Sequence, residues 1–153
     1  MVKKIIDSPV GKLTITADKE AIIGLDWGKA DALEQQSTPL IAECEKELAA
    51  YFAGELKIFT VPIKFKGTPF QEDVWRALTT IPYGKTVSYG FIAKQVGKPK
   101  ASRAVGGANH NNPISIIVPC HRVIGTTGKL VGFGGGLDAK EYLLKLEGAI
   151  FKK

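Results

Sequence analysis

The sequence predicts an α+β protein in which an antiparallel-sheet lobe is followed by a mainly helical lobe. Short runs with alternating apolar residues fill the first 27 positions, whereas apolar residues recur at three- and four-residue intervals after Pro39. The chain has 153 residues, 44% of them hydrophobic, and is therefore long enough to bury a core. We place the boundary between lobes 1–66 and 67–153 at the turn residues Gly67-Thr68-Pro69.

Three β-strands are expected at the start of the first lobe. Residues 2–6, 12–17 and 21–27 are rich in β-branched and apolar side chains, and polar or glycine-containing turns separate them. Because such short connections join antiparallel neighbours, we expect the three strands to form a meander.

An amphipathic helix of about three to four turns is expected to begin at Pro39 and to stop at Gly54. Its apolar face contains Leu40, Ile41, Cys44, Leu48, Tyr51 and Phe52. Since Cys44 lies on this face, we interpret it as a buried, inert thiol. Residues 57–66 mix apolar and basic side chains, and we expect a strand or an extended linker there.

The second lobe is predicted to open with a helix from Phe70, preceded by Thr68-Pro69, in which Trp75 belongs to the core. Two short helices follow, one over 89–96 capped by Ser88 and one over 101–109, and they form a helix-turn-helix pattern. The second of them is almost wholly small residues around Arg103. Such a composition fits either close approach to a bulky surface or tight helix packing, and the spacing does not decide between them.

A last helix is expected over 138–147, with Asp138 as its N-cap. We expect Leu137, Tyr142, Leu143 and Leu146 on its buried side. Glu147 falls at the C-terminal end of this helix, where the helix dipole disfavours a carboxylate, so we expect a compensating partner. The glycine-rich stretch 125–137 before the helix is read as a loop.

Basic residues are concentrated in the second lobe. Residues 1–66 carry a net charge of −1 and residues 67–153 a net charge of +7. No acidic residue lies between Asp73 and Asp138, whereas eight Lys and Arg residues do. A stretch of one sign suits a phosphate backbone, although a solvated basic face is the usual alternative.

The acid-free stretch also contains the thiol Cys120, which lies between apolar, strand-like runs and directly before His121 and Arg122. Because a thiol reacts as the thiolate, we expect the neighbouring imidazole and guanidinium to lower its pKa below the unperturbed value of roughly 8.5. The two cysteines and two histidines lack paired metal-ligand spacing, so no metal site is expected. With no apolar run long enough to span a bilayer and no signal peptide, we expect an intracellular protein without membrane contact.

Several ordered motifs resemble the O6-alkylguanine-DNA alkyltransferase family, also called methylated-DNA--protein-cysteine methyltransferases. They are Arg103-Ala104-Val105-Gly106-Gly107-Ala108, Asn112-Pro113, Pro119-Cys120-His121-Arg122-Val123, Gly135-Gly136-Leu137 and the run from Lys140 to Gly148. The resemblance covers nearly the whole chain and is dense from about Phe70 onward. It implies a ribonuclease H-like first lobe and a winged helix-turn-helix in the second.

The resemblance also implies roles for individual residues. Cys120 would accept the alkyl group, His121 would be the base linked to it through a water, and Glu147 would orient and charge the imidazole. Asn112 would hold the turn before the cysteine, and Tyr89 would crowd the DNA phosphate and donate a proton to the base. Arg103 would replace the extruded nucleotide in the duplex. The other DNA-binding residues would be Ala101, Ser102, Gly106 and Tyr89, and the pocket would be lined by Val123, Phe133, Gly134 and Gly135.

The implied reaction is irreversible, stoichiometric transfer of an alkyl group from O6 of guanine, and from O4 of thymine, to Cys120 after nucleotide flipping. No cofactor is needed. The partner would be double-stranded alkylated DNA, bound through its minor groove by a monomer in the cytoplasm, at the nucleoid, or in the nucleus of a eukaryote. Phe133 stands where many relatives have Tyr, and Gly134 where some have Ser, which bears on substrate preference rather than on the reaction.

Two other functions fit parts of the pattern. One is a DNA-binding helix-turn-helix module in which Cys120 is structural; it would bind DNA in a salt-dependent way without covalent change. The other is a cysteine hydrolase built on Cys120, His121 and Glu147, which would turn over an acyl substrate repeatedly. Adjacent cysteine and histidine are unusual for such hydrolases, whose catalytic residues generally lie far apart in the sequence.

Overall fold

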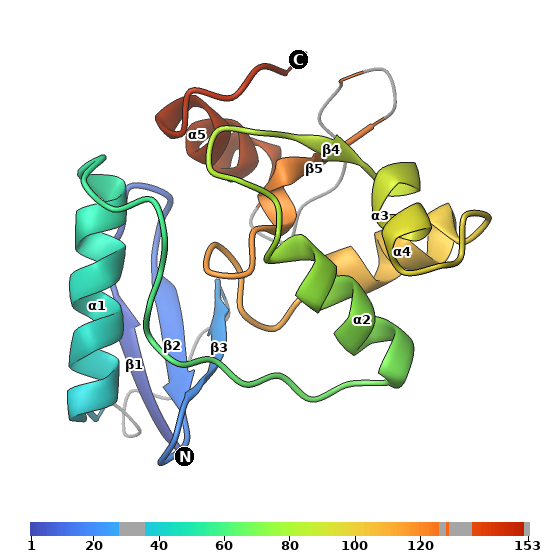
Figure 1. Ribbon diagram of the computed structural model, residues 1–153. Helices are drawn as coiled ribbons and strands as arrows, with labels where there is room; N and C mark the ends of the chain where they lie inside the picture. The colour runs from blue at the N-terminus through green and yellow to red at the C-terminus, as the bar shows by residue number, and fades with distance from the viewer. Residues whose placement is uncertain (28–35, 126–127, 129–135, 152–153) are drawn as a thin grey trace. The chain divides into compact units, whose positions relative to one another are not determined.

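The computed structural model describes residues 1–27, 36–125, 128 and 136–151 (Figure 1). Contacts within the chain divide it into two compact units, Met1–Phe65 and Lys66–Lys153. The first unit contains a β-sheet and one helix, and the second is mainly helical. The predicted α+β class is confirmed.

The sheet of the first unit is an antiparallel meander, as the alternating pattern predicts. It consists of β1 (Val2–Ile6), β2 (Leu13–Ala17) and β3 (Ile22–Asp26), in the order β1-β2-β3. The middle strand is the most deeply buried, and its register with β3 shifts between Thr16 and Ala17. Residues 57–66 form no strand, and only an isolated bridge joins Ile63 to Ile22.

Helix α1 (Pro39–Phe52) lies beside this sheet (Figure 1). Thr38 caps it, because the hydroxyl oxygen of Thr38 accepts a hydrogen bond from the backbone N–H of Ile41 at 3.3 Å. Cys44 is fully buried on its apolar face, and burial raises the pKa of this thiol to about 12. The predicted inert thiol is therefore confirmed in its surroundings.

The second unit begins with α2 (Pro69–Leu78), which opens with a capping box between Thr68 and Gln71. Trp75 is buried, and its indole N–H donates to the backbone carbonyl of Ala108, 2.8 Å away. This bond connects α2 to α4 (Ser102–His110) and confirms that Trp75 belongs to the core. Between them lies α3 (Tyr89–Gln95), capped by Ser88 as predicted.

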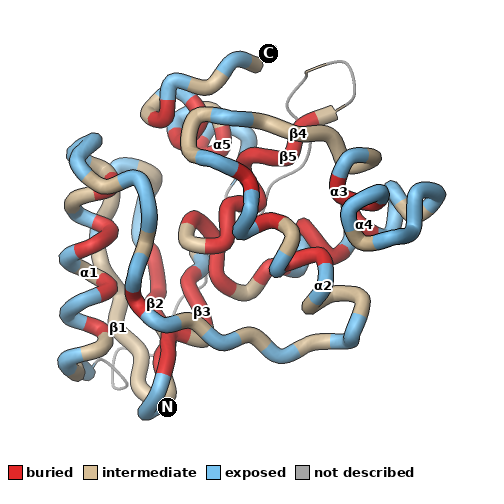
Figure 2. Tube along the Cα trace, viewed as in Figure 1, coloured by how far each residue is buried: buried red, intermediate tan, exposed pale blue. Residues whose placement is uncertain are grey.

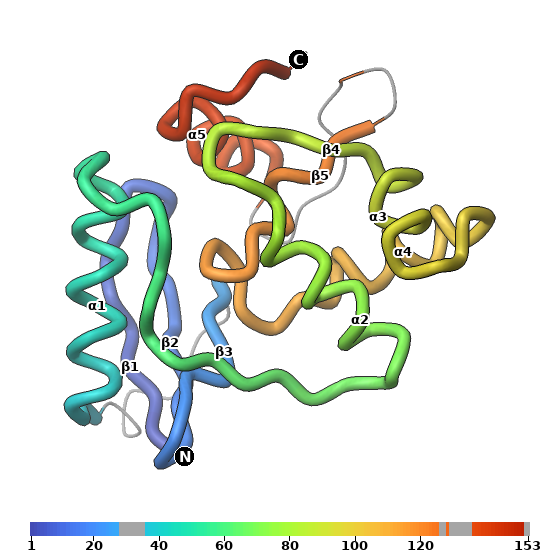
Figure 3. The backbone as a smooth tube through the Cα atoms, in the orientation of Figure 1, coloured from blue at the N-terminus to red at the C-terminus, as the bar shows by residue number. Residues whose placement is uncertain are grey.

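Two short parallel strands, β4 (Val87–Ser88) and β5 (Val123–Ile124), place the start of α3 next to the segment after Cys120. The last helix is α5 (Leu137–Leu146). Figure 3 traces the chain from α4 through a folded-back loop to β5.

The predicted cap and buried side of α5 are wrong in part. The N-cap is Gly136, with φ of 91°, rather than Asp138. Leu137 and Tyr142 are 49% and 39% exposed, whereas the buried residues of the helix are Ala139, Lys140, Leu143 and Leu144. The helix therefore buries a different face from the predicted one. Lys140 lies on the buried face, where its ammonium donates to the backbone carbonyl of Val123. Figure 2 shows the resulting buried face of α5 and the buried segment around β5.

Candidate active site

Cys120 opens a single 3-10 turn, Cys120–Arg122, that leads directly into β5. The residue is 3% exposed, and its neighbours His121 and Arg122 are also buried. The preceding apolar residues do not form the predicted strand; residues 114–118 fold into a tight turn with an isolated bridge between Ser115 and Val118. A turn allows both the thiol and the next two polar side chains to face the interior.

Asn112 holds this turn at both ends. Its amide nitrogen donates to the carbonyl of Val118 at 2.8 Å, and its amide oxygen accepts from the backbone N–H of Ile114 at 3.0 Å. Asn112 is buried, so these bonds do not compete with bulk water. Asn112 follows the end of α4 and binds the backbone on both sides of the turn, so it fixes the path of the chain from α4 to Cys120.

Glu147, the C-cap of α5, binds both residues that follow the cysteine. Nε2 of His121 lies 2.7 Å from Oε2 of Glu147. The Arg122 guanidinium donates from Nε to Oε1 at 2.8 Å and from Nη2 to Oε2 at 3.0 Å, and its Nη1 donates to the carbonyl of Ile81 at 2.6 Å. The predicted partner of the misplaced carboxylate is therefore an imidazole and a guanidinium together.

This arrangement keeps the carboxylate ionised and the imidazole neutral. Burial opposes the charge on Glu147, but hydrogen bonds and charge from His121 and Arg122 lower its pKa to about 2. Burial lowers the pKa of His121 more than Glu147 raises it. The expectation that Glu147 charges the imidazole is therefore wrong, because the ring is neutral at pH 7. A carboxylate only accepts hydrogen bonds, so the ring proton lies on Nε2 and Nδ1 carries a lone pair.

Nδ1 of His121 is buried, and within the described part of the chain it has no hydrogen-bond partner. The proton-accepting atom of the pair is thus directed into the interior rather than toward Glu147.

The pKa of Cys120 is raised rather than lowered, because burial outweighs every favourable interaction. The prediction that His121 and Arg122 lower it is wrong: one is neutral and the other is paired with Glu147. Smaller contributions that favour the thiolate come from hydrogen bonding by Asn112, the charge of Lys140 and hydrogen bonding by Ser115. The Lys140 side chain is fully buried, its Nζ donates to the carbonyl of Val123 at 2.6 Å, and burial lowers its pKa to about 8.

Tyr89, at the first position of α3, is near enough to Cys120 for the two side chains to interact electrostatically. Burial, followed by the charge of Cys120, raises the pKa of its phenol, so the hydroxyl remains protonated and able to donate. Gly106 of α4 faces this ring, since a Cβ at Gly106 would lie 3.9 Å from Cε1 of Tyr89. Hydrogen bonding by Asn109 has the opposite, smaller effect and lowers the pKa of the phenol. The side-chain nitrogen of Asn109 also donates to the backbone carbonyl of Cys120 at 3.4 Å.

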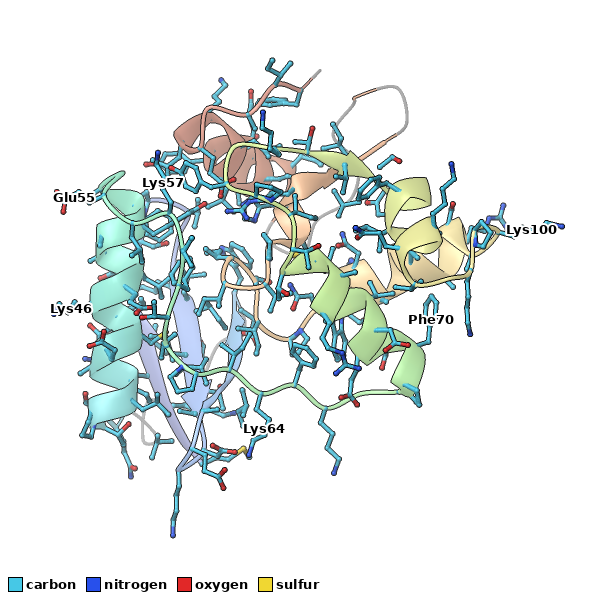
Figure 4. All side chains as sticks on the ribbon, in the orientation of Figure 1. Lys46, Glu55, Lys57, Lys64, Phe70 and Lys100 are labelled. Carbon is cyan, nitrogen blue, oxygen red and sulfur yellow. The ribbon has the colours of Figure 1, made fainter. Side chains whose placement is uncertain are left out.

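Besides Tyr89, the residues predicted to contact DNA belong to α4 or to its N-cap, Ala101. Ser102 and Arg103 are exposed, and Ala101 and Gly106 are half-buried. Lys100, just before the helix, extends away from the protein body (Figure 4). Val123 is buried with its carbonyl bound to Lys140, and the other three predicted pocket residues, Phe133, Gly134 and Gly135, lie outside the described residues.

Sequence reasoning missed four residues of this site. Arg122 was expected to act on the thiol, not to hold Glu147, and Lys140, Ser115 and Asn109 were given no role. The available signal for Lys140 was its spacing from Leu143 and Leu144, which places it on their side of a helix. Ser115 offered no comparable signal, because its place beside the thiol depends on the turn.

The described residues include neither a metal centre nor a helix that could span a membrane. They contain no group of three or more His, Cys, Asp or Glu side chains arranged to hold a metal ion. No helix among them is long and apolar enough to cross a membrane.

Both units match families of known proteins. Residues 1–65 match the family described as 6-O-methylguanine DNA methyltransferase, ribonuclease-like domain, and residues 69–149 match 6-O-methylguanine DNA methyltransferase, DNA binding domain. A Methanosarcina acetivorans protein named methylated-DNA--protein-cysteine methyltransferase is 50% identical over 151 residues, covering 95% of this chain and 97% of that protein. A Mycobacterium tuberculosis protein of the same name is 50% identical over 152 residues, covering 93% and 89%.

The fold is similar to solved structures as well. The crystal structure of Mycobacterium tuberculosis OGT in complex with DNA has a TM-score of 0.89 and 49% sequence identity, covering 97% of this chain and 93% of that chain.

Proposed function

This chain belongs to the 6-O-methylguanine DNA methyltransferase family, and on that premise we propose that it repairs alkylated DNA by direct reversal. It transfers an alkyl group, such as methyl, from O6 of guanine to Cys120. It also accepts an alkyl group from O4 of thymine, because that oxygen holds the alkyl group by the same kind of C–O bond. The protein reacts once, since none of the described residues around Cys120 is placed to hydrolyse a thioether.

The observation that carries this proposal is the buried thiol followed by a neutral imidazole that a carboxylate orients. His121 accepts the thiol proton at Nδ1, through a water, because Nε2 already donates to Glu147. The thiolate sulfur then attacks the alkyl carbon, the new S–C bond forms as the C–O bond breaks, and the electron pair leaves with the base.

Tyr89 supplies the proton that the departing base requires. Its phenol is kept in the protonated form by burial, and the charge of Cys120 acts on it. The net reaction moves the alkyl group to sulfur and one proton to the base, so no cofactor takes part. The basic Lys140 supports the thiolate before attack through its charge.

The partner is alkylated double-stranded DNA, bound at the surface that contains the start of α4. Solved relatives support this, since the similar Mycobacterium tuberculosis OGT has been crystallised in complex with DNA. A reacting oxygen inside a duplex is out of reach of a buried thiol, so the nucleotide is flipped out. Exposed Arg103 fills the gap in the stack, and the small residues Ala101, Ser102 and Gly106 let α4 approach the minor groove.

The flipped base contacts the backbone of Val123, and Phe133, Gly134 and Gly135 wall its pocket. The protein acts as a monomer in the compartment that holds the DNA, the cytoplasm of a prokaryote or the nucleus of a eukaryote. Residues 67–153 carry the reaction, and residues 1–66 form a supporting domain.

Comparison of wild type with Cys120→Ala tests the proposal. The variant should bind methylated duplex DNA with the same salt dependence as wild type and transfer no methyl group. Methyl transfer by the variant would contradict the assignment of Cys120. DNA binding without any transfer by the wild type would favour the helix-turn-helix module, and repeated turnover of an acyl substrate would favour the hydrolase.

A further inference from the structure

Ile116 has a backbone conformation that a β-branched residue rarely adopts. Its φ is 73°, and it is the one non-glycine residue with positive φ in the described part of the chain. The side chain is 1% exposed, so the residue is fixed in the interior. This conformation is unfavourable for a β-branched residue and persists only where the surrounding structure enforces it.

The surrounding hydrogen bonds enforce this conformation. The N–H of Ile117 donates to the carbonyl of Ser115 at 2.8 Å, which closes a γ-turn centred on Ile116. The N–H of Val118 donates to the carbonyl of Ile114 at 2.9 Å, closing a second turn around the same residue. Asn112 binds the backbone at Ile114 and Val118, the two ends of that second turn.

The turn determines where Ser115 lies. It pairs Ser115 with Val118 in an isolated bridge, and Cys120 follows at once, with its N–H bound to the carbonyl of Val118 at 2.8 Å. Ser115 is 8% exposed and Cys120 is 3% exposed, so both lie in the interior next to this turn. Hydrogen bonding by Asn112 and by Ser115 lowers the pKa of the Cys120 thiol, although burial has the larger, opposite effect. An extended segment would instead carry Ser115 away from Cys120, five residues later in the chain, at about 3.3 Å per residue.

We propose that the left-handed turn at Ile116 is a positioning device that holds the Ser115 hydroxyl against the Cys120 sulfur, where Ser115 and Asn112 replace the water that would otherwise solvate the thiolate. This inference rests on the proposed function, because it concerns the same thiol. It assigns Ser115 a direct part in forming the nucleophile and Ile116 a positioning part.

A buried thiolate needs such donors, because burial alone disfavours its charge. The ionisable groups that act on the thiol from neighbouring elements are Lys140 of α5 and Tyr89 of α3. Of these, only Lys140 carries a positive charge. The hydroxyl of Ser115 is neutral and short, so it stabilises the thiolate without placing a second cation in the site.

A hydrogen bond from Ser115 to the thiolate should change how the reaction rate depends on pH, which a purely structural role of Ser115 would not do. A hydrogen bond lowers the thiol pKa and also lowers the intrinsic reactivity of the thiolate, with a Brønsted coefficient of about 0.4–0.5 for thiolate displacement. Ser115→Ala should raise the midpoint of Cys120 titration by about one pH unit, from the typical strength of hydrogen bonds to charged groups. Methyl transfer should then be about threefold slower below the midpoint and about threefold faster well above it.

The test measures thiolate absorbance against pH in the full chain without DNA, and methyl transfer from duplex DNA containing O6-methylguanine in parallel. The absorbance curve of Cys120→Ala is subtracted to remove the tyrosines, and Cys44 does not interfere below its pKa of about 12. Ser115→Thr keeps the hydroxyl and should keep the wild-type midpoint. Thr80→Ala, which removes an exposed hydroxyl bound to the carbonyl of Ala77, is the matched control and should change neither curve.

Ile116→Gly tests the turn itself, since glycine accepts positive φ and also other conformations. Ile116→Gly should raise the midpoint of the Cys120 titration. Adding Ser115→Ala to that variant should raise the midpoint by less than Ser115→Ala does in wild type, because the two residues act together. If Ile116→Gly does not fold, Ser115→Ala still decides. An unchanged midpoint and a rate ratio that is the same at every pH in Ser115→Ala would overturn the inference. Absence of methyl transfer by wild type would instead count against the proposed function, because the thiolate titration does not depend on DNA.

Discussion

Nε2 of His121 lies 2.7 Å from Oε2 of Glu147, and both side chains are fully buried. Because the same carboxylate is also bound by Arg122, it stays ionised and the imidazole does not need to become charged to hold it. The pair therefore fixes the tautomer in which Nδ1 accepts a proton. The pair provides a base and the group that orients it, directly after the buried thiol of Cys120.

Glu147→Gln should slow methyl transfer by about 10²-fold, within the range of general-base contributions. A glutamine amide can donate to Nε2 and thereby place the ring proton on Nδ1, which removes the base. The variant should also become fast only at higher pH, where the thiol ionises without help. Single-turnover rates on methylated duplex DNA across pH measure this, and a rate and pH profile equal to wild type would mean that the carboxylate is structural only.

Arg122→Met should lower the free energy of unfolding by roughly 3–5 kcal/mol, because it leaves the buried carboxylate without its cation. Denaturant unfolding measures the change. Arg76→Met is the matched control: that arginine is exposed, pairs with Glu72 and Asp73, and should cost no more than about 1 kcal/mol. Equal losses in the two variants would show that the buried ion pair contributes nothing special.

Acid should remove stability that Glu147 contributes. The folded pKa of about 2 lies below the ordinary 4.5, so the contribution is fully present above pH 4.5 and is lost as pH falls toward 2. Asp18, paired with Lys64, has its pKa lowered to about 2 and titrates in the same range. The measurement is therefore the difference between wild type and Glu147→Gln in unfolding free energy against pH. That difference should shrink on acidification, and a constant difference would contradict the assigned pKa.

Arg103→Ala should reduce transfer from duplex DNA more than transfer from a free O6-alkylguanine base. The side chain is exposed at the start of α4 and is needed only to replace an extruded nucleotide. Rates on the two substrates, measured side by side, give the ratio. Equal losses on both would rule out insertion into the duplex.

Lys140→Met should raise the pH at which Cys120 titrates, because it removes the cation that favours the thiolate. It should slow transfer most at neutral pH and least at high pH. Thiolate absorbance against pH measures the midpoint. An unmoved midpoint would show that the lysine serves only to bind the carbonyl of Val123.

The sequence was sufficient for most of the fold because local signals agreed with the tertiary structure. The alternating runs predict the meander, and Pro39, the pair Thr68-Pro69 and Ser88 mark the starts of three helices. The predicted buried face of the last helix differs from the observed one, because lysine is usually a surface residue and Lys140 is buried. The spacing of Lys140 from Leu143 and Leu144 places it on the buried face, but its hydrogen-bond acceptor is the carbonyl of Val123 in a distant segment, which the local sequence does not reveal.

The candidate site was predictable in its membership and not in its electrostatics. Motif resemblance brought together Cys120, His121, Glu147 and Asn112, and the structure places them close in space. The state of the thiol and imidazole depends on burial and on competition for Glu147, which are properties of packing. The apolar run before Cys120 predicts a strand, because isoleucine and valine favour extended backbone. The structure has a turn there, with φ of 73° at Ile116, because Asn112 hydrogen-bonds the backbone at Ile114 and Val118.

Intact mass after incubation with duplex DNA containing O6-methylguanine, followed by peptide mapping, tests the central claim most directly. The account predicts one added methyl group, ~14 Da, per molecule, located on Cys120. Cys120→Ala, treated in parallel, should remain unmodified. An unchanged wild-type mass despite tight DNA binding, or a methyl group on any other residue, would contradict the account.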